Sequence, residues 1–172
     1  MAFGVCAALG TRSDAAAQGE AQVFTIAKSE NRNLVQYAVH VDAECAPTAG
    51  APVYAYWRML EQGPTRTAPL LAREHKAYGL ASQQIVPPVT AGAAGAVRVA
   101  LAALPARPVL VETWRASDGA CRAQATITIA GAPAHLSDVY VRLRPPLGVE
   151  YLLLQGWSMD GTHRVEEKLG AS

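Results

Sequence analysis

The sequence carries little charge, and no stretch of it concentrates charge of one sign. Asp, Glu, Lys and Arg make up 17% of the 172 residues, with 15 Lys plus Arg against 14 Asp plus Glu. Charged residues make up about a quarter of an average soluble domain. A surface that binds DNA or RNA gathers positive charge, because phosphate contacts supply much of the affinity. We therefore expect no nucleic-acid partner.

Catalytic and cofactor-binding motifs are also missing. The four histidines show none of the paired His or Cys spacings that are typical of zinc sites. There is no G-x-S-x-G turn for a serine nucleophile, and no glycine-rich loop that would hold a nucleotide phosphate. The sequence predicts no cofactor and no metal, and it favours a non-catalytic protein over an enzyme.

No apolar run reaches the roughly 18 to 20 residues that cross a membrane as a helix. A shorter apolar run, residues 2–9, precedes a polar stretch and the triplet Ala15-Ala16-Ala17, in the order of a signal peptide and its cleavage site. The positive residues that begin such a leader are missing, as they would be if the true start codon lay upstream. We expect residues 1–17 to be a truncated leader and residues 18–172 a single β-rich domain that is periplasmic or secreted. An Ala-rich tail on a cytoplasmic protein is the alternative.

Cysteine is scarce, with three residues in the chain. Cleavage of the leader would remove Cys6 and leave Cys45 and Cys121. An even number of cysteines in an exported protein predicts a disulfide. The alternative is that one of the two is a free nucleophile, although acidic residues precede both and would raise the pKa of a thiol.

Alternation of apolar and polar residues dominates the chain after residue 20. Val35, Tyr37, Val39 and Val41 fall on one face of the clearest strand, because successive side chains of a strand point to opposite faces. Asp118-Gly119 and Asp160-Gly161 each predict a hairpin turn. Eight to ten such strands predict an all-β fold, a single antiparallel β-sandwich or a barrel-like domain.

One short helix is expected near residues 68–77. Thr67 can cap it, and Pro69 is tolerated in a first helical turn. Pro105 and Pro108 are expected to bracket a connection, since proline interrupts strand pairing.

Three stretches carry a resemblance when taken together: Phe24 to Asn33, Val53 to Leu60, and Arg73 to Gly79. With Asp138-Val139-Tyr140-Val141 and Val149-Glu150-Tyr151, they resemble a bacterial family of exported proteins called domain of unknown function 4833. The resemblance covers roughly residues 22–169. It implies a single β-rich exported domain and supplies no catalytic residue.

The third strand offers the best candidate for a binding surface. Tyr54, Tyr56 and Arg58 alternate on one of its faces, and Tyr78 follows nearby. Aromatic rings beside a guanidinium suit an anionic or sugar ligand. We expect these four residues to bind an unknown small molecule or an envelope protein. The alternative is that the helix covers this face and that Arg58 pairs with Glu74.

A second hypothesis is a small extracytoplasmic hydrolase or isomerase that uses His40 and Asp42, or a free cysteine. His40 and Asp42, with Glu44 nearby, could also hold a metal, although a solvated polar face produces the same pattern. Catalysis requires that at least two of these polar groups converge in one pocket.

Overall fold

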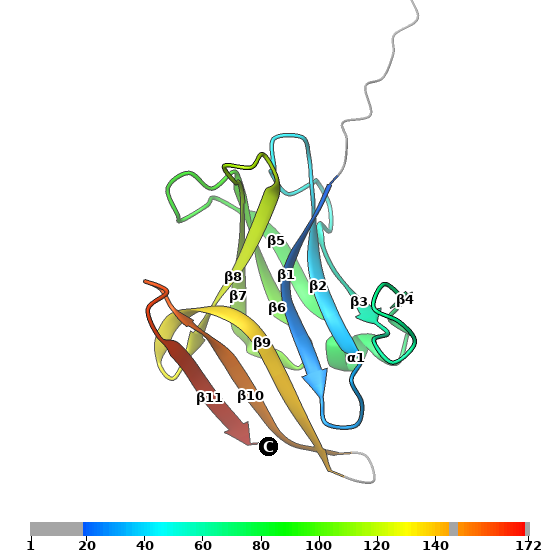
Figure 1. Ribbon diagram of the computed structural model, residues 1–172. Coiled ribbons are helices and arrows are strands. Elements are labelled where there is room, and N and C mark those ends of the chain that lie inside the picture. The colour runs from blue at the N-terminus through cyan, green and yellow to red at the C-terminus, as the bar shows by residue number, and fades with distance from the viewer. Residues whose placement is uncertain (1–18, 145–147, 171–172) are drawn as a thin grey trace, which may run out of the picture.

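The computed structural model describes residues 19–144 and 148–170 (Figure 1). The predicted leader, residues 1–17, lies outside the described residues. The fold is mostly β with almost no helix, which confirms the predicted class. The elements are β1 (Gly19–Lys28), β2 (Leu34–Val41), β3 (Val53–Arg58), β4 (Thr67–Pro69), α1 (His75–Tyr78), β5 (Leu80–Val86), β6 (Gly95–Leu101), β7 (Leu104–Arg115), β8 (Cys121–Ile129), β9 (Ala132–Arg144), β10 (Gly148–Ser158) and β11 (Arg164–Gly170).

All of these strands belong to a single sheet, with the order β4-β3-β2-β1-β9-β8-β7-β6-β5. Strand β9 is the branch point. Its first half pairs with β8, its second half pairs with β1, and β10 runs along its other edge. The hairpin of β10 and β11 therefore lies beside the main sheet (Figure 1). The sheet is mixed rather than purely antiparallel, because β1 and β9 run parallel.

The sheet curves but does not close, since β4 and β5 are its two ends. One side chain nevertheless joins strands from the two ends. The Gln83 amide of β5 accepts from Val53 N–H of β3 at 2.9 Å and donates to Val53 C=O at 3.1 Å. The Gln83 amide takes the place of a neighbouring strand for the N–H and C=O of Val53. Backbone polar groups near the interior require such a hydrogen-bond partner.

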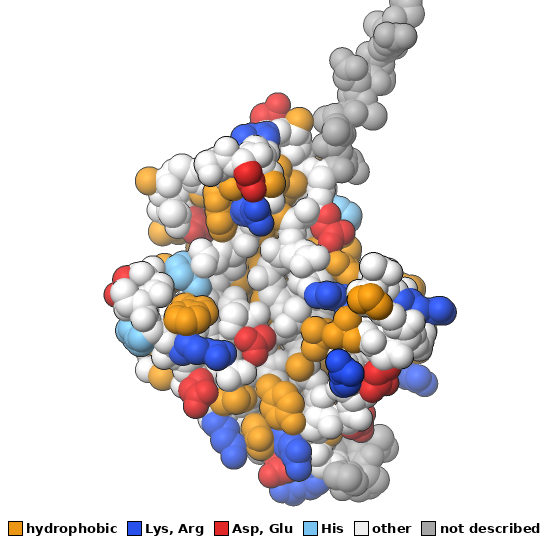
Figure 2. Space-filling view, in the orientation of Figure 1, with side chains coloured by type: hydrophobic (Ala, Val, Ile, Leu, Met, Phe, Trp, Pro, Cys, Tyr) orange, Lys and Arg blue, Asp and Glu red, His pale blue; other side chains and the backbone are white. Residues whose placement is uncertain are grey.

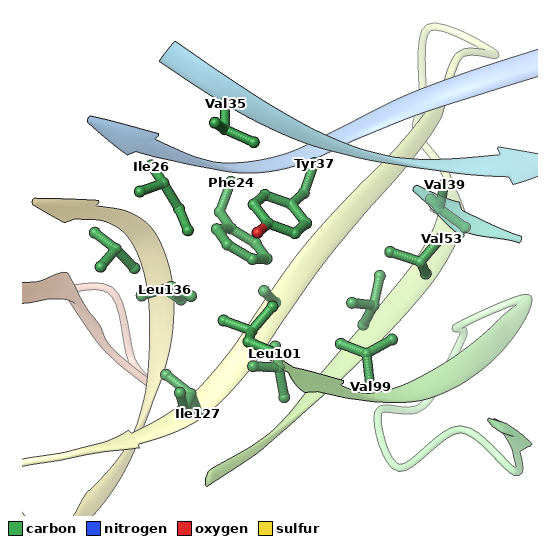
Figure 3. Close-up of a cluster of buried hydrophobic side chains, with 14 of the residues drawn as sticks. Phe24, Ile26, Val35, Tyr37, Val39, Val53, Val99, Leu101, Ile127 and Leu136 are labelled. Carbon is green, nitrogen blue, oxygen red and sulfur yellow. The ribbon is translucent and has the colours of Figure 1, made fainter. Parts of the chain in front are cut away.

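The core lies inside the curve of the sheet (Figure 3). Val35, Tyr37, Val39 and Val41 are all fully buried, as their alternation predicts. Tyr37 stacks on Phe24 with the ring centroids 4.3 Å apart. A cavity of about 20 Å³ beside Tyr37 has room for little more than a water molecule, so it does not provide a ligand-sized chamber.

The helix differs from the prediction. It covers only His75–Tyr78, and Thr67–Pro69 form strand β4 instead of a helical first turn. Strand β3 leaves backbone groups open at its edge, and pairing with β4 satisfies them along Tyr56↔Pro69 and Arg58↔Thr67. Proline is acceptable there because β4 is an edge strand. Pairing with β3 therefore outweighs the helical propensity of these residues.

The predicted connection at Pro105 and Pro108 is also wrong, since both residues lie within β7. Pairing of β7 with β8 starts only at Leu110↔Thr126, so the missing proline N–H groups break no bond to β8. The predicted hairpin turns are confirmed between β7 and β8 and between β10 and β11. Gly119 and Gly161 have φ of 83° and 69°, a region that glycine enters without strain.

Cys45 and Cys121 form a disulfide, with their Cα atoms 5.3 Å apart. The bond ties the loop between β2 and β3 to the start of β8. Arg115 adds a second tie, because its guanidinium donates to the carbonyl of Ala43 in the same loop. The predicted pairing is confirmed, and neither cysteine is a free thiol. In the part of the chain that the structure describes, no helix has the length and apolar character needed to cross a membrane.

Candidate functional site

Tyr54 and Tyr56 form a row of rings with His40 on the outer face of β2 and β3. The ring centroids of His40 and Tyr54 lie 4.2 Å apart, and those of Tyr54 and Tyr56 lie 5.8 Å apart. The rings of each pair are stacked, so the row presents ring edges along most of its length. Both tyrosine hydroxyls donate to the carboxylate of Glu20 on β1.

The bonds to Glu20 limit what this tyrosine row can offer a ligand. Partial burial and the neighbouring Glu20 carboxylate raise the pKa of Tyr54 and of Tyr56 above the ordinary value. Both hydroxyls therefore stay protonated and remain engaged with Glu20. A hollow of about 460 Å³ lies beside the row and is bounded by Thr67 and Pro69.

The four residues predicted to bind a ligand do not all meet. Arg58 lies two residues beyond Tyr56 on β3, and its charge acts on the Tyr56 hydroxyl. Tyr78 lies on the core side of the strand, where its ring packs edge-on against Trp57 with the centroids 5.5 Å apart. Its backbone carbonyl also accepts from the Tyr37 hydroxyl. Tyr78 thus supports Trp57 from behind and is separate from the tyrosine row.

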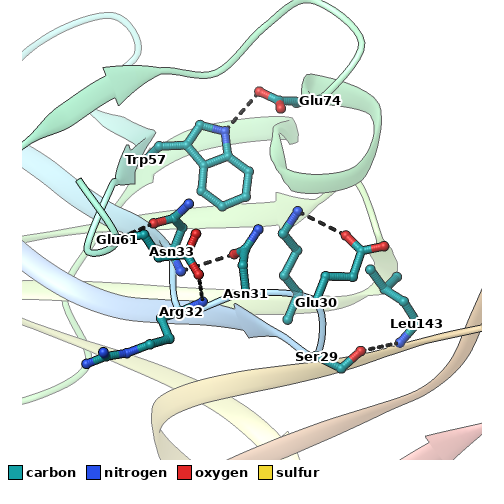
Figure 4. A network of polar contacts seen from close by, with 10 residues as sticks. Ser29, Glu30, Asn31, Arg32, Asn33, Trp57, Glu61, Glu74 and Leu143 are labelled. Carbon is teal, nitrogen blue, oxygen red and sulfur yellow. Dashed lines mark hydrogen bonds and ion pairs between the residues drawn. The ribbon is translucent and has the colours of Figure 1, made fainter.

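A different pocket forms where β1 and β3 end, and we call it the indole cleft. It has a volume of about 320 Å³ and is lined by Lys28, Asn31, Asn33, Trp57, Met59, Ala68, Pro69, Leu71 and Glu74. Figure 4 shows Trp57 with Glu74 on one side of its ring and with Asn31 and Asn33 on the other.

Glu74 is fixed in place by two hydrogen bonds. One of its oxygens, Oε2, accepts from the indole N–H of Trp57 at 2.9 Å and from the Leu71 N–H at 2.8 Å. Burial alone would raise the pKa of Glu74, but these bonds and the positive charges of Arg73 and Lys28 outweigh it and lower the pKa below the ordinary value. The carboxylate is therefore ionised at neutral pH, and its second oxygen can accept a further bond.

The two asparagines are oriented by their backbone surroundings. Asn31 Oδ1 accepts from Asn33 N–H at 3.1 Å, and Asn33 Oδ1 accepts from Glu61 N–H at 3.2 Å. Only the oxygen of a carboxamide can accept from an N–H, so these bonds fix which way each amide faces. Both NH₂ groups then point toward the indole (Figure 4).

Lys28 adds a positive charge to the same wall of the cleft. Its ammonium lies 5.2 Å from the centroid of the Trp57 ring, within the range of a cation–π interaction. It also lies 3.4 Å from a carboxylate oxygen of Glu30. An ammonium has three donors, so this ion pair leaves capacity for other acceptors.

The residues named for catalysis are engaged elsewhere. Asp42 Oδ1 accepts from the N–H groups of Glu44 and Ala46, at 3.0 and 2.9 Å, and so shapes the turn that carries Cys45. His40 belongs to the tyrosine row. Within residues 19–144 and 148–170, no group of three or more His, Cys, Asp or Glu side chains could hold a metal ion.

The alternation of side chains along the strands does not reveal the indole cleft. It assigns Trp57 to the core face, and the residues around Asn31 look like an ordinary polar turn. The signal that could have found the cleft is the resemblance. Its first three stretches, Phe24 to Asn33, Val53 to Leu60 and Arg73 to Gly79, contribute most of the lining and meet at this pocket.

A family model for a domain of unknown function (DUF4833) matches residues 24–168, and the chain belongs to this family. No curated protein and no solved structure matches the chain.

Proposed function

We propose that this protein is an exported, non-catalytic domain that binds a small polar ligand in the indole cleft. The observation that supports this is the convergence of oriented polar groups on one pocket. Three nitrogen donors, from Lys28, Asn31 and Asn33, and the ionised Glu74 border a cleft of about 320 Å³. Ligand sites of roughly 300 to 1,000 Å³ with a few well-placed polar groups are typical of small-molecule binding.

The fixed orientation of these groups favours binding over catalysis. The carboxamides are held by backbone N–H groups, so little conformational entropy is lost when a ligand binds. A general base works best with a pKa near neutrality, whereas the pKa of Glu74 is lowered. That carboxylate suits the role of a permanent acceptor better than that of a proton carrier.

The tyrosine row is proposed as an accessory contact. Tyr54 and Tyr56 border a hollow that shares Ala68 and Pro69 with the indole cleft, and Arg58 follows them on the same strand. A larger ligand or an envelope protein seated in the cleft would reach the row around β4. Tyr78 would act indirectly, by holding the Trp57 ring.

Export is the second part of the proposal. The disulfide between Cys45 and Cys121 supports it, because such bonds persist in oxidising compartments. We propose that residues 1–17 are removed after Ala17. Mass spectrometry of the protein from the periplasm or the medium should give an N-terminus at Gln18, and a chain that starts at Met1 would contradict the proposal.

Ligand-observed NMR tests the binding site. The probes are a mixture of simple sugars, amino acids, carboxylic acids and phosphate esters, each at millimolar concentration. We expect hits with the wild-type protein and their loss in Lys28→Met. Lys168→Met is the matched control, because Lys168 also lies over an aromatic ring, 4.0 Å from the centroid of Tyr151, and it should keep the hits.

Two results would overturn the proposal. Hits that survive Lys28→Met unchanged would place binding elsewhere, and Tyr54→Ala would then show whether the tyrosine row is responsible. A complete lack of hits with the folded wild-type protein would remove the case for a small ligand and leave a protein partner.

A further inference from the structure

Two opposite charges face the indole cleft without pairing with each other. The Lys28 ammonium lies on the Trp57 ring and pairs with Glu30. The Glu74 carboxylate is held at the indole N–H. The two charges are close enough for Lys28 to lower the pKa of Glu74, yet each has a different partner. Hydrogen bonds to an ionised donor or acceptor are stronger than neutral ones, so a ligand group of opposite charge suits each of these two positions.

The donors and the acceptor lie on different sides of the cleft. Lys28, Asn31 and Asn33 come from the end of β1 and the loop that follows it, whereas Glu74 comes from the segment before α1. Figure 4 shows Glu74 across the indole from the two asparagines. One wall therefore offers an ammonium and two amide donors, and the facing wall offers an anionic acceptor.

The rest of the lining is apolar. Met59, Ala68, Pro69 and Leu71 complete the pocket, and 52% of the Leu71 residue is exposed. Figure 2 shows the same combination on the surface in the region of β3 and β4, where apolar side chains lie between groups of both charge signs. A ligand that fills this pocket needs both charges and a hydrocarbon part.

We propose that the indole cleft binds a zwitterionic α-amino acid with an apolar side chain. This inference rests on the proposed function and names the ligand class of the same site. The carboxylate of the ligand accepts from Lys28, Asn31 and Asn33. Its ammonium donates to the free oxygen of Glu74, and its side chain contacts Met59 and Leu71.

Other ligand classes match the cleft less well. A simple anion would face repulsion from Glu74, and a simple cation would face repulsion from Lys28. A neutral sugar could bond to the same groups but would bring no charge to either Lys28 or Glu74, and hydrogen bonds that involve charged groups are roughly twice as strong as neutral ones.

The test compares L-leucine with two blocked forms of it. The readout is the indole N–H signal of Trp57 in ¹H–¹⁵N spectra, assigned by its loss in Trp57→Phe. We expect L-leucine to shift this signal in a saturable way. N-acetyl-leucine lacks the ammonium and leucinamide lacks the carboxylate, and each should bind at least 10-fold more weakly.

Glu74→Gln separates a charge effect from loss of structure. Glutamine keeps an oxygen that can accept from Trp57 and Leu71, so the fold should persist. The affinity of this variant for L-leucine should be at least 10-fold lower than that of the wild type. Its affinity for N-acetyl-leucine should be no lower than that of the wild type. Glu166→Gln, on the exposed face of β11, is the control and should behave as the wild type.

The possible outcomes distinguish this inference from the proposed function. If sugars or blocked leucine shift the Trp57 signal as strongly as L-leucine does, the proposed zwitterionic ligand class is wrong, but the proposed binding site is supported. If none of the amino acids, sugars, carboxylates or phosphate esters shifts it, both proposals fail.

Discussion

The ion pair between Arg107 and Glu167 should make the stability of the domain depend on pH. The guanidinium of β7 makes two bonds to the carboxylate of β11, at 2.6 and 2.7 Å, and Ala130 N–H adds a third at 2.8 Å. These contacts hold the outermost strand of the β10–β11 hairpin against the main sheet. Because of the bonds from Arg107 and then Ala130, the pKa of Glu167 falls from 4.5 to about 2.

The size of the effect follows from this shift. If the whole pKa shift of Glu167 contributed to the free energy of unfolding, it would correspond to about 3 kcal/mol. The two side chains keep 30% and 21% of their surface exposed, so solvent screens the pair and we expect about 1 to 2 kcal/mol. The folded pKa is depressed, so the contribution is complete above the unfolded pKa near 4.5 and is lost as the pH falls toward 2.

The perturbation is Glu167→Gln, and the assay is thermal and urea unfolding at several pH values. Above about pH 5 the melting temperature should fall by about 3 to 6 °C, and the difference from the wild type should shrink toward zero near pH 2. Arg142→Met breaks a more exposed pair with a 3.8 Å contact and should change little. A Glu167→Gln effect no larger than that control, or one that persists at pH 2, would refute the reasoning.

Three further changes test other parts of the fold. Replacing both Cys45 and Cys121 with Ser removes a disulfide with a sequence separation of 76 residues and should lower the free energy of unfolding by about 4 kcal/mol or somewhat less. Urea unfolding in oxidising buffer measures this loss, and an equal loss in strong reductant would contradict the disulfide as its cause. Gln83→Met leaves the N–H and C=O of Val53 without their side-chain partner and should lower the free energy of unfolding by about 1 to 3 kcal/mol. The readout is faster hydrogen exchange at Val53, and the control is Gln84→Met, at an exposed position of the same strand. Glu112→Ala removes the acceptor of three bonds from Val89 and Thr90 and should speed hydrogen exchange at both amides by about 10-fold; unchanged exchange would show that the loop is held by other contacts.

Much of the fold could be predicted because strand alternation is a local property. The buried face of β2 and both Asp-Gly hairpins depend only on neighbouring residues, and each is confirmed. The parallel pairing of β1 with β9 joins Thr25 to Asp138, and no local pattern encodes a contact over such a distance in sequence. The predicted start of the helix is wrong for the same reason, because the edge of β3 decides the conformation of Thr67 to Pro69.

The position of Trp57 explains why the indole cleft is harder to predict than the core. Alternation places Trp57 on the same face as Val53, and both are buried, at 8% and 2% exposure. Strand β3 ends one residue beyond Trp57, however, and there the loop after β1, strand β4 and the segment before α1 line a pocket with its ring. Of the polar side chains that line the cleft with it, Asn31, Asn33 and Glu74 come from segments without periodicity. Strand alternation alone assigns Trp57 to the core, whereas the structure also places its ring in the lining of the indole cleft. Trp57, rather than the outward-facing tyrosines, is therefore the more informative residue for testing the proposed binding site by mutation.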